Sequence, residues 1–157
     1  MNMIRTSLLL PLFALSLTAC GGSVTETADI EGCEHLKEGP AAPVTATSAA
    51  TGAPEVSNDH KRYDVTLPSG AAGYVSFAPS MAHGYVFFLS QAVPFAVKDA
   101  AGADVTVSSS SLTGAKCPEV KGRHLVSLGV GTYRLVLGPA AGIGTVGMVV
   151  EEESHAH

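Results

Sequence analysis

Residues 73–90 read GYVSFAPSMAHGYVFFLS, and this stretch decides the fold. In its first part Val75 and Phe77 alternate with other residues, so both point to the same side of an extended chain. Its second part, residues 84–90, is apolar at almost every position, which is typical of a strand covered on both faces. The stretch therefore predicts two strands of a packed β structure, the second of them central.

Six further runs of the same texture follow or precede this stretch, separated by Gly, Pro and Ser, which favour turns. None shows the spacing of an amphipathic helix. The runs are residues 62–67, 93–99, 104–108, 123–128, 132–138 and 145–151. The sequence therefore predicts an all-β domain at residues 58–153, an antiparallel β-sandwich or jelly roll of about eight short strands.

Residues 129–131, GVG, separate two of these runs, and we predict a hairpin turn there. The surrounding segment 126–137, VSLGVGTYRLVL, resembles the late hairpin of bacterial pre-peptidase C-terminal domains. In that family a strand ends in Leu, a Gly-containing turn follows, and Gly-Thr-Tyr opens the next strand. The resemblance implies a small jelly-roll accessory module without a catalytic centre.

The beginning of the chain has the layout of an export signal. Arg5 precedes the apolar run 7–17, SLLLPLFALSL, which has the length of a signal-peptide core and is too short to span a bilayer. Residues 17–20, LTAC, then resemble the lipobox of bacterial lipoproteins. The resemblance implies removal of residues 1–19 and attachment of diacylglycerol and a palmitate-type acyl chain to Cys20. The alternative is an ordinary secretory signal with an incidental cysteine.

Acyl chains of this kind hold a soluble domain to a membrane without a transmembrane helix. We therefore expect a lipid-anchored protein of the cell envelope. The residue after Cys20 is Gly21 and not Asp, which resembles the lipoproteins of enteric bacteria that are destined for the outer membrane. We therefore expect the protein to be in the outer membrane. The expected partner is the membrane, reached through the N-terminal lipid, and the sequence indicates no particular protein or ligand partner.

The charge balance excludes another class of partner. The net charge is −5, and loss of Arg5 with the signal leaves eight basic against fourteen acidic residues. Nucleic-acid binding needs a basic face, so we expect no nucleic-acid partner. The sequence also has no second long apolar run that could make it a polytopic membrane protein.

Two cysteines remain once Cys20 is lipidated, and an even pair in an exported chain predicts a disulfide between Cys33 and Cys117. The alternative is a metal site formed by Cys33, His35 and Cys117. If the disulfide forms, residues 33–40, CEHLKEGP, become a strap across the sandwich. Residues 20–57 are otherwise expected to be a flexible tether, because residues 41–54 carry little apolar surface to bury.

The C-terminal residues 154–157 contain His155 and His157, which follow three glutamates. Imidazole and carboxylate ligands suit Zn²⁺, Ni²⁺ or Cu²⁺, so these histidines are a candidate metal site. The alternative is a solvated, charged tail. Apart from this possible divalent metal, we expect no cofactor.

Catalytic motifs of the common hydrolases are missing from the sequence. It contains no G-x-S-x-G, S-x-x-K or H-E-x-x-H pattern. We therefore expect a non-enzymatic envelope lipoprotein with a structural or binding β-sandwich domain. The alternative function is divalent-metal binding through the histidine-containing tail.

Overall fold

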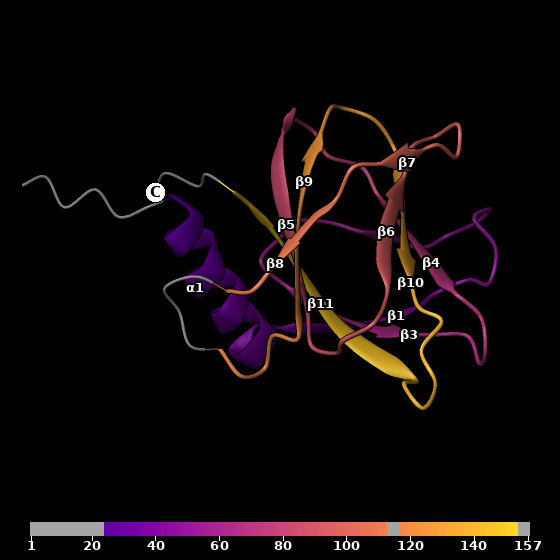
Figure 1. Ribbon diagram of the computed structural model, residues 1–157, viewed down its shortest axis with the longest axis horizontal. Coiled ribbons are helices and arrows are strands. Elements are labelled where there is room, and N and C mark those ends of the chain that lie inside the picture. Colours follow the sequence, from indigo (N-terminus) through magenta and orange to yellow (C-terminus); the bar gives the residue numbers. More distant parts are fainter. Residues whose placement is uncertain (1–23, 113–116, 154–157) are drawn as a thin grey trace, which may run out of the picture.

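The computed structural model describes residues 24–112 and 117–153, in which two β-sheets pack face to face and a helix covers one of them (Figure 1). The first sheet contains, in spatial order, β1 (Ala41–Thr45), β3 (Arg62–Thr66), β11 (Thr145–Glu152), β5 (His83–Leu89), β9 (Gly122–Leu128) and β8 (Ser108–Ser110). The second contains β2 (Glu55–Val56), β4 (Gly73–Phe77), β10 (Tyr133–Leu137), β6 (Phe95–Lys98) and β7 (Asp104–Val105). The predicted all-β sandwich is confirmed.

The core between the sheets is built from alternating side chains. The ring of Phe77, from β4, meets the rings of Tyr85 and Phe87, from β5, edge to face at centroid distances of 5.1 and 5.6 Å. All three side chains are buried. Burying an aromatic or aliphatic side chain contributes about 1.5–3 kcal/mol, and edge-to-face contacts add to this. The alternation visible in the sequence therefore defines this core.

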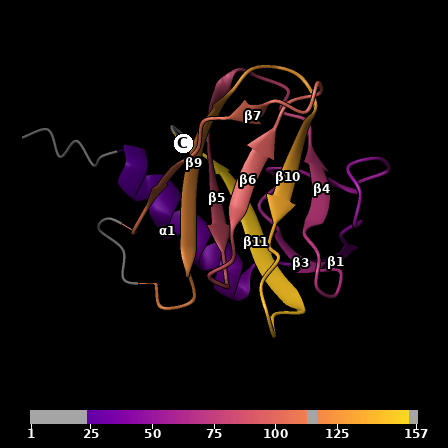
Figure 2. The same cartoon turned by 45° about the vertical axis from the view of Figure 1, so that its right-hand side comes forward.

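The strands at the centre of the first sheet are buried on both faces. In β5, Phe87 and Leu89 face the second sheet, whereas Val86 and Phe88 face outward. The outer face is covered by the helix α1 (Val24–Glu38), which lies on the side of the first sheet away from β4, β6 and β10 (Figure 2). This layer explains why residues 84–90 are apolar at almost every position.

The helix corrects the expectation of a flexible tether at residues 24–32, and it contains most of the strap expected at residues 33–40. The apolar contact of α1 with the sheet is made by Ala28, Gly32 and Leu36, which repeat every four positions and so share one face. A Cβ on Gly32 would overlap the ring of Phe88 and lie 2.7 Å from its Cζ atom. Glycine therefore lets the helix backbone approach the sheet closely. Two of these three residues are small, so the contact stripe has no strong hydrophobic signature.

Residues 41–57 also differ from the expected linker. β1 pairs with β3 and β2 pairs with β4, both in parallel, so the two sheets are mixed and not purely antiparallel. The two sheets therefore include residues that precede the expected domain boundary at residue 58. β1 lies at a sheet edge, where its Pro43 is tolerated, and such pairing uses backbone groups without needing large side chains. With β8, these additions make eleven strands within the described residues, where about eight were expected.

The expected hairpin at residues 129–131 is wrong. β9 belongs to the first sheet and β10 to the second, so this turn carries the chain from one sheet to the other. Val126 and Leu128 before the turn, and Leu135 and Leu137 after it, all face the shared core. A hairpin and a crossover between sheets produce the same alternation, so the sequence pattern did not separate them.

Candidate functional site

A carboxylate is buried between α1 and the first sheet. Along β11, Val146, Met148 and Val150 face the core between the sheets, so the intervening Val149 and Glu151 face the helix. The side chain of Glu151 is 1% exposed. A buried carboxylate is costly unless it has polar or charged partners.

Two imidazoles supply those partners. Nδ1 of His35, near the end of α1, lies 2.6 Å from Oε1 of Glu151, and an imidazole N–H donates a hydrogen bond to the carboxylate. Nδ1 of His60, in the loop between β2 and β3, lies 3.5 Å from Oε2. The two imidazole rings are 5.1 Å apart and tilted by 60°. We call these three residues the His35/His60/Glu151 cluster.

The electrostatics of the cluster are set mainly by burial. Burial raises the pKa of Glu151, and the hydrogen bond from His35 with the charges of His35 and His60 offsets part of that rise. A second carboxylate, Glu31 on α1, raises the pKa of Glu151 further. Glu31 precedes His35 by four residues and therefore lies on the same side of the helix. Burial and Glu31 thus act against the ionised form of Glu151, and the two imidazoles act in its favour.

The loop that carries His60 is fastened at several points. Asn58 donates a hydrogen bond from Nδ2 to Oε1 of Glu152 at 2.8 Å. The hydroxyl of Tyr63 donates to Oδ1 of Asp59 at 2.8 Å. His60 itself has φ of 57°, and among the described residues it is the one non-glycine residue with a positive φ. Holding a non-glycine residue in this conformation costs of order 1–3 kcal/mol, and such residues concentrate at functional sites.

A second buried ionic contact holds α1 to β9, further across the same face of the sheet. Nε of Arg123, on β9, donates to Oδ1 of Asp29, on α1, at 2.6 Å. The two side chains are 5% and 0% exposed. Nη1 of Arg123 also donates to Oγ of Ser110, on β8, at 3.0 Å. This contact is structural, since it fixes the helix against the sheet and offers no open position for a ligand.

The disulfide between Cys33 and Cys117 is confirmed, with the two Cα atoms 5.8 Å apart. It joins α1 to the segment that precedes β9. Because both sulfurs are oxidised, they are not thiolate ligands, and the alternative metal site of Cys33, His35 and Cys117 is wrong. His35 points instead to Glu151.

Three candidate residues from the sequence have no described position. Cys20, His155 and His157 lie outside the described residues. His124 lies on β9 on the other face of the sheet, where its ring stacks on Phe95 at 4.7 Å and its Nδ1 lies 2.7 Å from Oγ of Ser109.

His124 predicts a measurable pH dependence. Burial lowers its pKa from the ordinary value of 6.5, and its buried Nε2 has no hydrogen-bond partner among the described residues. The unfolded chain therefore binds this proton first, and stability is lost as the pH falls from about 6.5 toward the lower pKa of the folded state. We expect the Tm of the parent to fall more steeply than that of His124→Gln between about pH 7 and pH 5. Parallel curves in thermal melts would contradict this assignment.

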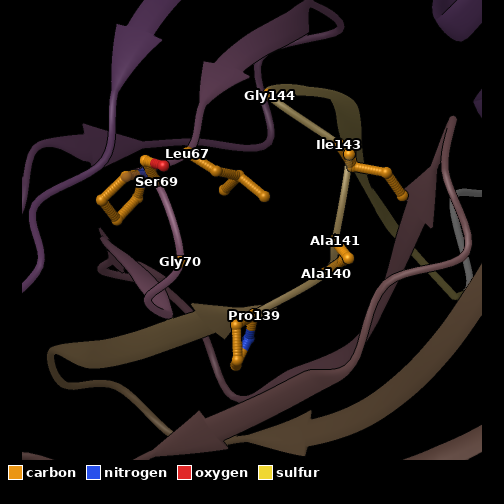
Figure 3. Close-up of a pocket in the computed structure, with 10 residues that line it drawn as sticks. Leu67, Ser69, Gly70, Pro139, Ala140, Ala141, Ile143 and Gly144 are labelled. Atoms are coloured by element: carbon orange, nitrogen blue, oxygen red, sulfur yellow. The ribbon is translucent and has the colours of Figure 1, made fainter.

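A shallow depression of about 690 Å³ lies at one end of the sandwich, between the loops 67–70 and 139–144. Leu67 and Ile143 lie on opposite sides of it (Figure 3). None of its ten lining residues is ionisable, and Ser69 supplies the one side-chain hydroxyl. The depression therefore offers surface for contact and no groups suited to acid–base chemistry.

Comparison with protein-family models and with curated proteins finds no match to this chain. Within the part of the chain that the structure describes, no helix has both the length and the apolar character needed to cross a membrane.

From the sequence, His35 is a candidate ligand only together with the two cysteines. Glu151 is one of the three glutamates that precede the C-terminal histidines. One available signal was the alternation in residues 145–151, which places Glu151 on the same face of the strand as Val149. A carboxylate in register with a buried valine is unusual and marks a candidate site. His60 offered no such signal.

Proposed function

We propose that the protein is a lipid-anchored lipoprotein of the cell envelope, in the outer membrane, whose sandwich is a non-enzymatic structural or binding domain. The observation that carries the proposal is the sequence LTAC at residues 17–20, directly after an apolar run of signal-peptide length. The acidic chain would be repelled by anionic lipid, so the acyl chains would provide its hold on the membrane.

The position of α1 adds a geometric consequence to this proposal. The helix begins at Val24, four positions after Cys20. Four residues span at most about 14 Å even when fully extended. Because α1 packs on the sandwich, a lipid on Cys20 would hold the folded domain directly at the membrane surface and not on a long stalk.

A labelling experiment with Cys20→Ala tests the proposal. We expect the parent to incorporate labelled palmitate and to remain with membranes until detergent is added. Cys20→Ala is expected to lose all label and to accumulate as unprocessed precursor, because the acylated thiol is missing. Thr18→Ala, which keeps a small residue before the cysteine, is the matched control and should be labelled like the parent. A parent that takes up no label, or Cys20→Ala labelled as strongly as the parent, would overturn the proposal.

A further inference from the structure

We propose that His35, His60 and Glu151 form a binding site for one divalent transition-metal ion of the Zn²⁺ type. The three residues come from α1, from the loop before β3 and from β11, so the fold brings together side chains that lie up to 116 residues apart. The proposal does not rest on the lipid anchor.

The ligand atoms of the cluster lie close enough together for one ion to reach all three residues. With bonds of about 2.0–2.2 Å from Zn²⁺ to nitrogen and oxygen, neighbouring ligand atoms lie about 3.3–3.5 Å apart. The Nδ1 atom of His60 and Oε2 of Glu151 are already 3.5 Å apart. Potential ligand atoms of all three residues lie within 4.8 Å of one another. Nδ1 of His35 lies 2.6 Å from the other oxygen, Oε1, so a carboxylate that binds through one oxygen has to turn for both imidazoles to share the ion with it.

The charges favour a cation at this position. A divalent ion bound by the three side chains would compensate the buried carboxylate of Glu151 in place of a proton. Two imidazoles and a carboxylate are ligands that Zn²⁺, Ni²⁺ and Cu²⁺ accept, whereas Mg²⁺ and Ca²⁺ prefer oxygen alone.

The exposure of the ligands indicates an open site. Glu151 is buried, but the side chains of His35 and His60 are 22% and 45% exposed. Three protein ligands leave one tetrahedral position for water or for a ligand group from outside. The backbone at His60 is left-handed, a conformation that glycine adopts more readily than histidine. The imidazole is therefore placed there at a conformational cost.

Calorimetric titration with Zn²⁺ tests the proposal on the full chain carrying His155→Ala and His157→Ala, which removes the tail histidines as competing ligands. We expect one ion per chain with a Kd tighter than about 10 µM. Adding Glu151→Gln, which is isosteric and neutral, is expected to weaken binding at least about 10-fold. Adding His124→Gln, the matched control on the opposite face of the sheet, should leave the Kd unchanged.

His60→Gly separates loss of the metal ligand from loss of the fold. Glycine suits the positive φ at this position, which offsets part of the lost contact with Glu151, so the metal-free variant should still unfold cooperatively within a few degrees of its parent. The increase in Tm that Zn²⁺ gives the parent should disappear in this variant. The proposal fails if the tail-substituted chain binds no Zn²⁺ tighter than about 10 µM, or if His60→Gly and Glu151→Gln bind it as tightly as their parent.

Discussion

Replacing both Cys33 and Cys117 by serine is expected to lower the free energy of unfolding by about 4–5 kcal/mol. The disulfide closes a loop with a sequence separation of 84 residues, and opening it releases the unfolded chain from that constraint. The folded state is also expected to lose stability, because the apolar contact between α1 and the sheet is a narrow stripe in which Ala28 and Gly32 are small. A loss of this size is a large part of the stability of a typical domain.

Urea denaturation followed by circular dichroism measures this loss. Adding reductant to the parent should reproduce the midpoint of the double variant, because both treatments break the same bond. Reductant should leave the midpoint of the double variant itself unchanged. A difference below about 1 kcal/mol between parent and double variant would show that the disulfide contributes little to the fold.

Asp29→Ala is expected to destabilise the protein by about 3–5 kcal/mol, because it leaves the guanidinium of Arg123 buried without its carboxylate. Arg123 is 5% exposed and would have to reach water by moving α1 or the end of β9. The loss therefore comes mainly from an uncompensated buried charge and less from the attraction of the pair itself.

The exposed pair of Lys98 and Asp104 is a matched control. Its N–O distance is also 2.6 Å, but its side chains are 32% and 78% exposed. Asp104→Ala should therefore cost less than about 1 kcal/mol. Replacing Asp29 by Leu together with Arg123 by Met should recover most of the stability lost in Asp29→Ala. Equal losses for Asp29→Ala and Asp104→Ala in chemical denaturation would contradict the burial argument.

The alternation of apolar and polar side chains made the sandwich predictable. The edge strands β1 and β2 and the helix α1 lack this pattern and were not predicted. The runs at residues 62–67 and 145–151 match β3 and β11, because each presents apolar side chains at every second position to the core. β1 and β2 join the sheets by backbone pairing at edges, which leaves little trace in side-chain type. The helix was missed because close packing on Phe88 requires glycine at position 32, and glycine normally argues against a helix.

The candidate site was predictable only in part. The pairing of Cys33 with Cys117 followed from the cysteine count once Cys20 was assigned to the lipid. The hydrogen bond between His35 and Glu151 requires α1 to pack over β11. This contact could not be predicted while residues 20–32 were expected to be a flexible tether. His60 reaches the cluster from a loop. The conformation of that loop depends on the contact of Asn58 with the distant Glu152 and on the contact of Asp59 with Tyr63.

The lipid anchor is the central claim of this account, and mass spectrometry of the N-terminal peptide tests it most directly. The protein should be extracted from membranes with detergent and digested without prior removal of acyl groups. We expect the chain to begin at Cys20, with its mass increased by a diacylglycerol on the thiol and an acyl chain on the amino group. A chain that still begins at Met1, or a mature chain whose Cys20 carries no lipid, would contradict the account.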